Sequence, residues 1–126
     1  LKGLKVLLVD DSLETLEAFH ALLELEGAQV HAESNAQQAL AAAKQEDFDL
    51  ILSDIGMPTM DGYEFIAALR KLPRTAAVPA IALTGFGRAP DAAKALDAGF
   101  DAHLGKPVSL PDLLGAIARI RGPKSE

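Results

Sequence analysis

Five short apolar runs alternate along the chain with five segments of helical period, and this alternation limits the fold more than any other feature of the sequence. The runs cover residues 4–9, 28–33, 48–53, 79–83 and 101–105. Short apolar runs that are each followed by one helix are typical of a parallel sheet covered by helices on both faces. The sequence therefore predicts an α/β protein with a doubly wound, five-stranded parallel sheet.

Capping residues mark where the helices begin and end. We expect the first helix to begin at Asp11 or Ser12 and to end at Gly27. Pro90 and Pro111 stand at early positions of the fourth and fifth helices, where proline is tolerated. In the first helix, the residues expected to face the core are Leu13, Leu16, Phe19 and Leu23.

Two residue pairs predict capping boxes at the starts of the second and third helices. Ser34 with Gln37 precedes an alanine-rich segment over 35–46, and Asp61 with Glu64 precedes the third helix. In the third helix, the residues expected to face inward are Tyr63, Ile66, Ala67 and Leu69.

The composition favours one domain with protein or cation partners. The chain has 126 residues, enough for one core, which we assign to residues 1–121, with 122–126 as a C-terminal tail. Its 18 acidic and 12 basic residues give a net charge of -6 without any basic run, which argues against nucleic acid as a partner. There is no cysteine, and no apolar stretch is long enough to span a membrane. We expect a soluble, cytoplasmic domain that makes no membrane contact itself, even where its parent protein is anchored in a membrane.

Three carboxylates end two of the predicted strands. Asp54 follows the third apolar run, and Asp10 with Asp11 follows the first. In a flavodoxin-like (βα)5 sheet of order 2-1-3-4-5 these two strands are neighbours, so the acids meet at the carboxyl edge, where such folds place their ligands. Carboxylates this close repel one another, and a hard cation with oxygen ligands relieves the repulsion. We therefore predict a site for Mg²⁺ or Mn²⁺, with the backbone carbonyl of Gly56 as a further ligand.

Two more polar residues end the remaining strands at the same edge. Thr84 follows the run 79–83, and Lys106 follows the run 101–105. A carboxylate beside a metal ion can act as a nucleophile toward phosphorus, as in aspartyl-phosphate chemistry. Thr84 and Lys106 would then hold the phosphoryl oxygens while the cation neutralises charge in the transition state.

Each acid taken alone has a plainer interpretation. Asp11 can be only a helix cap, and Asp54 only a turn residue before Pro58. A single acidic strand end favours that interpretation. The presence of Thr84 and Lys106 at the ends of two further strands favours a phosphoryl site instead.

The residues at these strand ends resemble the full signature of the receiver domain of two-component response regulators. Over residues 4–121, the matching residues are Asp10-Asp11, Asp54 with Met57-Pro58, Thr84-Gly85 and Lys106-Pro107. The resemblance implies that Asp54 accepts a phosphoryl group from a phosphohistidine of a histidine kinase or histidine phosphotransfer domain. It also implies that Asp10, Asp11, Asp54 and the Gly56 carbonyl hold Mg²⁺, and that Thr84 and Lys106 contact the phosphate.

The resemblance implies a signalling module of a phosphorelay rather than a conventional enzyme. Such a domain catalyses its own phosphorylation and slow autodephosphorylation. Phosphorylation shifts the population of a partner-binding surface on the fourth strand, the fourth helix and the fifth strand. A cis peptide before Pro107 would aim Lys106 inward.

Two segments are similar to receivers that are fused to hybrid sensor histidine kinases. They are residues 83–87 and residues 98–104. The first residue is Leu1 rather than methionine. From the sequence we therefore expect an excised receiver that is C-terminal to an attached kinase in its parent chain.

Three positions bear on how the resemblance translates into a switch. His103 stands where many receivers carry a tyrosine or phenylalanine that turns inward, and we expect it to stay solvent-facing as a partner contact. Thr84 and the loop 85–89 then carry most of the switch. Gly56 and Phe86 occupy positions that shape water access and so the lifetime of the acyl phosphate.

Two other classes of function compete with this interpretation. A haloacid-dehalogenase-type phosphatase also uses an aspartate and Mg²⁺ on a wound sheet, but it needs a second acid where this chain has Gly56. It also usually needs a cap, for which the chain has no spare length. A docking domain that keeps the fold without the chemistry is disfavoured, because the chain retains Asp10, Asp11, Asp54, Thr84 and Lys106.

Overall fold

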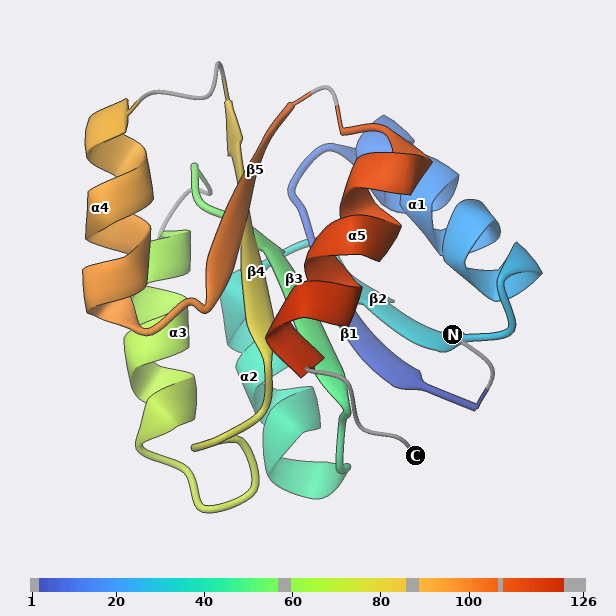
Figure 1. Ribbon diagram of the computed structural model, residues 1–126. Coiled ribbons are helices and arrows are strands. Elements are labelled where there is room, and N and C mark those ends of the chain that lie inside the picture. The colour runs from blue at the N-terminus through green and yellow to red at the C-terminus, as the bar shows by residue number, and fades with distance from the viewer. Residues whose placement is uncertain (1–2, 57–59, 86–88, 107, 122–126) are drawn as a thin grey trace.

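Each strand of the protein is followed by a helix, in the order that the alternating pattern predicts (Figure 1). The computed structural model describes residues 3–56, 60–85, 89–106 and 108–121, and for residues 84–85, 89–92, 106 and 121 it describes the backbone alone. The strands are β1 Lys5–Val9, β2 Gln29–Glu33, β3 Leu50–Asp54, β4 Ala80–Gly85 and β5 Ala102–Lys106. The helices are α1 Leu13–Leu25, α2 Ala36–Gln45, α3 Gly62–Arg70, α4 Ala89–Ala98 and α5 Leu110–Arg121. The tail over 122–126 lies outside the described residues.

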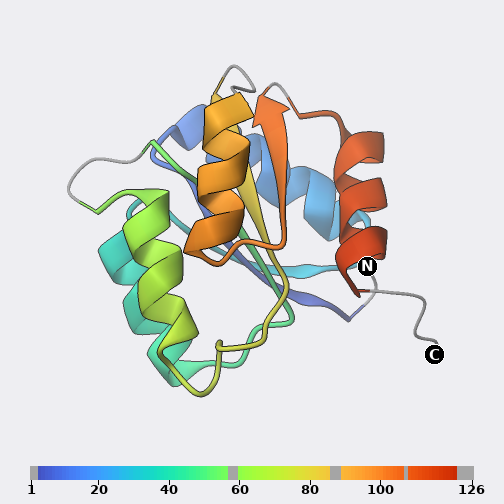
Figure 2. The ribbon, with the colours of Figure 1, turned by 60° about the vertical axis from the view of Figure 1, so that its left-hand side comes forward.

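The five strands form one parallel sheet of order β2-β1-β3-β4-β5, which confirms the predicted fold class. Helices α1 and α5 cover one face, and α2, α3 and α4 cover the other (Figure 1). Figure 2 shows α3 and α4 side by side on their face. Because neighbouring residues of a strand point to opposite faces, Leu8 packs under α1 and α5 while Leu7 packs on the other side.

The start of α1 agrees with one expectation and contradicts another. Ser12 is the N-cap, and its hydroxyl accepts a hydrogen bond from the Thr15 N–H at 3.3 Å. Leu13 was expected in the core but is 64% exposed, whereas Leu16 is buried. The expectation for Leu13 is wrong because the buried stripe of α1 begins one turn later, at Leu16, and leaves the first residue of the helix in solvent.

Helix α2 begins one residue later than predicted, so the capping box of Ser34 with Gln37 is wrong. The N-cap is Asn35, whose Oδ1 accepts a hydrogen bond from the Gln38 N–H at 2.8 Å. Serine and asparagine cap helices about equally well, so the preference of the cap residue alone does not choose between the two starts. The residues of α2 that face the core are Ala36, Ala39 and Ala43.

Helix α3 begins with the predicted capping box. The Asp61 carboxylate accepts from the Glu64 N–H at 2.9 Å, and the Glu64 carboxylate accepts from the Asp61 N–H at 3.1 Å. Its fully buried large side chains are Phe65, Ile66 and Leu69, with Tyr63 half-buried. The expectation for Ala67 is wrong, because this stripe faces the core and leaves Ala67 exposed on the other side of the helix.

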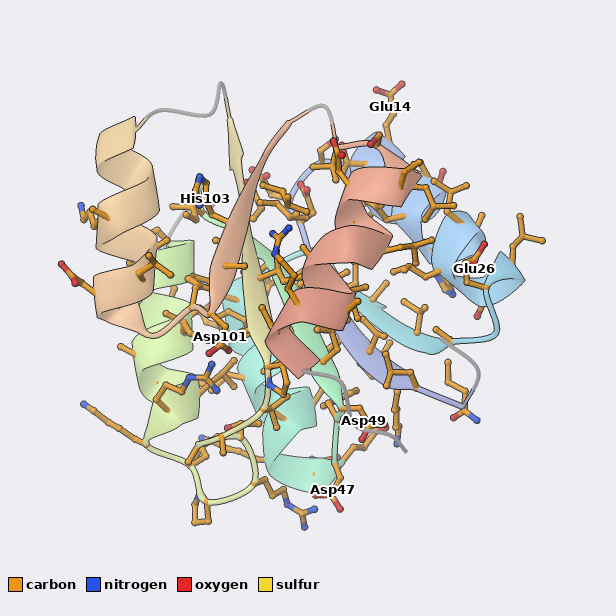
Figure 3. All side chains as sticks on the ribbon, in the orientation of Figure 1. Glu14, Glu26, Asp47, Asp49, Asp101 and His103 are labelled. Carbon is orange, nitrogen blue, oxygen red and sulfur yellow. The ribbon has the colours of Figure 1, made fainter. Side chains whose placement is uncertain are left out.

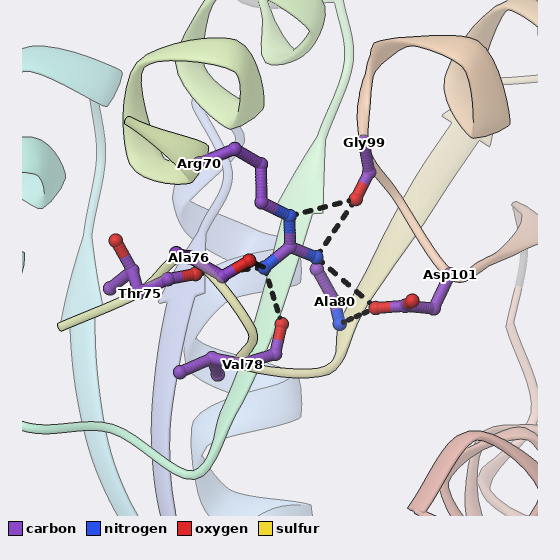
Figure 4. Close-up of polar contacts among 7 residues, drawn as sticks. All are labelled: Arg70, Thr75, Ala76, Val78, Ala80, Gly99 and Asp101. Atoms are coloured by element: carbon purple, nitrogen blue, oxygen red, sulfur yellow. Dashed lines mark hydrogen bonds and ion pairs between the residues drawn. The ribbon is translucent and has the colours of Figure 1, made fainter. Parts of the chain in front are cut away.

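Arg70, the last residue of α3, binds the chain at the amino end of the sheet (Figure 4). Its guanidinium donates to the carbonyls of Thr75 and Val78 in the segment before β4, at 2.8 and 2.6 Å. It also donates twice to the Gly99 carbonyl after α4, at 3.0 and 2.8 Å, and once to Asp101 at 3.1 Å. One side chain therefore joins the end of α3 to the segments that enter β4 and β5.

We predict that Arg70→Met lowers the free energy of unfolding by about 2–4 kcal/mol, because it leaves several carbonyls without a charged donor. Urea denaturation measures the loss. Arg74→Met is the matched control, because Arg74 is 46% exposed and makes one ion pair, with Asp47, which is 82% exposed. That variant should lose less than about 1 kcal/mol. Equal losses in the two variants would contradict the role of Arg70.

Candidate functional site

The structure brings Asp10, Asp11 and Asp54 together at the carboxyl edge of the sheet. One carboxylate oxygen from each lies within 4.8 Å of those of the other two. Asp10 is fully buried, Asp54 is 6% exposed, and Asp11 is exposed. The cluster, which we call the acidic cluster, therefore has two buried members and one that opens to solvent.

Strand pairing places two of these acids at one level. Val9 of β1 pairs with Ser53 of β3, so Asp10 and Asp54 each follow a residue of the same pair. The Asp10 N–H donates to the Glu33 carbonyl of β2 at 3.2 Å, which continues the sheet past the end of β1. The acidic cluster is thus a direct result of the parallel register.

The start of α1 orients the Asp10 carboxylate. The Ser12 N–H donates to Asp10 Oδ1 at 2.9 Å. Ser12 is also the N-cap of α1. Its backbone N–H therefore holds the buried Asp10 carboxylate, while its side chain caps the helix. The position of Asp10 therefore depends on where α1 begins.

Gly56 follows Asp54 by two residues and borders open space. A Cβ atom built on Gly56 would meet no atom within 4 Å. Gly56 is itself exposed, so the chain beside the acidic cluster is open to solvent at this point. Met57 and Pro58, which complete this part of the sequence signature, lie outside the described residues.

Thr84 and Lys106 lie at the predicted strand ends. Asp54 pairs with Leu83 across β3 and β4, so Thr84 is the next residue along β4. Thr84 pairs with Gly105, and Gly85 with Lys106, across β4 and β5. The side chains of Thr84 and Lys106 lie outside the described part of the chain, as do Phe86 and the Lys106-Pro107 peptide.

His103 lines a groove of about 550 Å³ along the edge strand β5. The lining residues are Leu96 of α4, Asp101, Ala102 and His103 of the β5 segment, and Arg119 and Ile120 of α5. Figure 3 shows His103 on the side of β5 nearer α4. Its ring is half-buried here, and whether it stays solvent-facing when the domain is phosphorylated stays a prediction.

Several other charged groups of the protein lie at the far end of the sheet or have partners outside the acidic cluster. Asp47 and Asp49 lie at the opposite end of the sheet (Figure 3). The His20 ring contacts Glu24 at 3.0 Å, and the His31 ring contacts Glu33 at 2.6 Å.

The chemistry of the acidic cluster follows from its charge and burial. Carboxylates held within a few ångströms of one another repel, and burial of two of them strengthens the repulsion because less water screens it. A divalent cation that takes oxygen ligands offsets this charge, and three carboxylates with a nearby carbonyl form the donor set that Mg²⁺ binds. The residues present therefore fit a hard cation.

Comparison with known sequences identifies a family over most of the chain. The family model of the response regulator receiver domain matches residues 6–118. The chain is 41% identical over 117 residues to a 14.6 kDa protein of Leptolyngbya boryana, covering 93% of this chain and 89% of that protein. It is 36% identical over 119 residues to the signal transduction histidine-protein kinase BarA of Escherichia coli K12, covering 94% of this chain but 13% of the kinase.

Solved structures give the same result. The receiver domain of the sensor histidine kinase PA1611 from Pseudomonas aeruginosa PAO1, solved with a magnesium ion in its active-site cleft, superposes with a TM-score of 0.86. The two chains are 30% identical, and the match covers 94% of this chain and 97% of that one. The phosphatase alternative finds no support in these similarities.

We predict that Asp54→Asn raises the stability of the protein in metal-free buffer by about 1 kcal/mol, because it removes one of three mutually repelling charges. Mg²⁺ at ten times its dissociation constant should stabilise the wild type by about 1.4 kcal/mol and the variant by less. Thermal unfolding with and without Mg²⁺ measures both effects. Asp47→Asn, which neutralises an exposed acid at the other end of the sheet, should leave the Mg²⁺ effect unchanged (Figure 3).

Proposed function

The chain belongs to the response regulator receiver domain family, and we propose that Asp54 is the residue that accepts its phosphoryl group. Receiver domains are the phosphoacceptor signalling domains of two-component systems. The observation that carries the assignment is the acidic cluster, in which Asp54 ends the central strand β3 with two further carboxylates close by. A nucleophile at the carboxyl edge of a parallel sheet can be reached by a partner protein.

The acidic cluster is also the proposed site for Mg²⁺, with Asp10, Asp11, Asp54 and the Gly56 carbonyl as ligands. Receiver domains bind Mg²⁺ at an acidic pocket, and the donor set of this cluster fits that ion. Bound Mg²⁺ supplies positive charge that offsets the charge of the phosphoryl oxygens. Asp11 is the exposed member and so is the first carboxylate that an incoming cation meets.

The transfer itself needs one nucleophile and one leaving group. A carboxylate oxygen of Asp54 gives an electron pair to the phosphorus of the donor phosphohistidine, and a new O–P bond forms as the P–N bond breaks. The departing imidazole keeps the electron pair of the broken bond and then takes a proton. The products are an acyl phosphate on Asp54 and a free histidine.

Thr84 and Lys106 are proposed to bind the phosphoryl group from the next two strands. Their backbone positions on β4 and β5 place them at the same edge as Asp54. A hydroxyl donor and an ammonium group are suited to the oxygens of a phosphoryl group, and the ammonium forms the stronger, charge-assisted hydrogen bond. Movement of these two strand ends on phosphorylation would then reach α4 and the groove that His103 lines.

Phosphoryl donors of receiver domains are histidine kinases and histidine phosphotransfer domains, and we propose a donor of this class here. The chain spans about an eighth of the length of BarA, so an attached kinase in the same polypeptide is also a proposal. Among the described residues, no helix has the length and apolar content that crossing a membrane requires.

We predict that Asp54→Asn abolishes phosphorylation, because the amide keeps the shape of the side chain but loses the nucleophilic oxygen and the charge. Acetyl phosphate with Mg²⁺ serves as the donor, and intact mass measures the adduct. The wild type and the control Asp47→Asn should each carry one labile phosphoryl group.

The same measurement separates the competing functions. An undiminished adduct in Asp54→Asn would move the acceptor to another residue. Turnover of many phosphate monoesters by the wild type would favour a phosphatase. No adduct on the wild type would favour a docking domain.

We predict that Lys106→Ala still allows some phosphorylation but uncouples it from the conformational response, because the phosphate loses its cationic partner. NMR spectra with and without phosphorylation measure the response over residues 84–104. Lys44→Ala is the control, because Lys44 is exposed in the last turn of α2, outside the fourth strand, the fourth helix and the fifth strand. Spectral changes in Lys106→Ala equal to those of the wild type would contradict the role of Lys106.

A further inference from the structure

We propose that Gly62 and Ser53 are positioning residues that fix the backbone of Asp54, and that the cation and phosphoryl chemistry of Asp54 depends on them. The inference rests on the proposed function, because it concerns how Asp54 is held rather than what Asp54 does. Neither residue belongs to the acidic cluster. Both contact the main chain of Asp54 or of the residue after it.

Gly62 packs against the acceptor with no room for a side chain. A Cβ atom at Gly62 would lie 2.6 Å from the Asp54 carbonyl oxygen and 2.7 Å from Ile55 Cα. Real Cβ atoms do not approach backbone atoms so closely, and backbone cannot yield as the end of a flexible side chain can. The backbone of Gly62 is not in the left-handed region, so the close approach rather than the backbone conformation excludes a side chain here.

A hydrogen bond holds the same two segments together. The Gly62 N–H donates to the Ile55 carbonyl at 2.8 Å, and the Ile55 N–H donates to the Leu83 carbonyl of β4 at 3.2 Å. The residue after Asp54 is thus held by α3 on one side and by β4 on the other. These two hydrogen bonds fix the direction in which the chain leaves β3. They therefore also fix the position of Gly56, the next residue.

Neither side of this contact can move away easily. Helix α3 is held by its capping box and by the buried side chains Phe65, Ile66 and Leu69. Strand β3 is paired with strands on both sides, and all five of its residues are buried. A methyl group at Gly62 must therefore displace the Asp54 to Gly56 segment, which includes the proposed nucleophile and a proposed ligand carbonyl.

Ser53 contacts the same carbonyl that Gly62 approaches. Ser53 is fully buried, and its hydroxyl donates to the Asp54 carbonyl at 2.9 Å. Groups that orient a ligand without touching the metal commonly affect metal binding, because a ligand must be held within a fraction of an ångström. Two independent contacts therefore fix one peptide group of the acceptor.

The test compares the Mg²⁺ dissociation constant and the rate of phosphorylation by acetyl phosphate in folded variants. Mg²⁺ alone is titrated by NMR, since the chain has no tryptophan to report binding. Gly62→Ala should weaken Mg²⁺ binding and slow phosphorylation about ten- to a hundredfold, as is usual when a supporting residue is lost. Ser53→Ala should have a smaller effect of about fivefold, the size expected from one hydrogen bond.

Two control variants separate positioning from general stability. Gly115→Ala adds the same methyl group to α5, where a Cβ would meet no atom within 4 Å, and should leave both measurements unchanged. Ile117→Val removes one methylene from the buried face of α5 and lowers stability. It should leave the Mg²⁺ dissociation constant unchanged. That result would show that a loss of stability by itself does not weaken Mg²⁺ binding, so that weaker binding in Gly62→Ala reports positioning.

The outcomes are distinct. Wild-type Mg²⁺ affinity and phosphorylation in a folded Gly62→Ala variant would overturn the role of Gly62, and the same result in Ser53→Ala would overturn that of Ser53. If Gly62→Ala does not fold, Ser53→Ala alone decides, and an unchanged Ser53→Ala then overturns the inference. If the wild type neither binds Mg²⁺ nor accepts a phosphoryl group, that result would instead overturn both the proposed function and this inference.

Discussion

The burial of strand β3 between β1 and β4 is the constraint on which the rest of the structure depends. All five residues of β3 are buried, and both of its edges are hydrogen-bonded to parallel neighbours. A strand held in this way cannot slip by one residue without turning its apolar side chains to the wrong face. Asp54, at the end of this strand, is therefore placed by the core of the protein and not by a loop.

The acidic cluster shows that this placement has an energetic cost. Asp10 and Asp54 are buried beside the exposed Asp11, and like charges in a poorly screened site destabilise the fold. The Ser12 N–H holds the Asp10 carboxylate in place against this repulsion. A cation that binds between the carboxylates relieves this repulsion. The folded protein therefore gains stability when the ion is present.

The two ends of the sheet differ in electrostatic character. The carboxyl end holds the three carboxylates of the acidic cluster, whereas at the amino end the Arg70 guanidinium binds carbonyls of two segments and pairs with Asp101 (Figure 4). One of these carbonyls is that of Gly99, which follows directly after α4. Arg70 thus joins the segments that enter β4 and β5 at the end of the sheet opposite the acidic cluster.

The sequence by itself determined the fold class and the candidate site, because both depend on local patterns. Apolar runs alternate with helical segments, and Asp54 stands directly at the end of one run. Contacts between distant segments were decided only by the tertiary structure. Asn35 caps α2 although Ser34 is an equally good cap residue, and Leu13 is exposed although it continues the apolar pattern of α1. The need for glycine at residue 62 and the partners of Arg70 depend on helices and strands that meet only in the folded chain, so no local pattern reveals them.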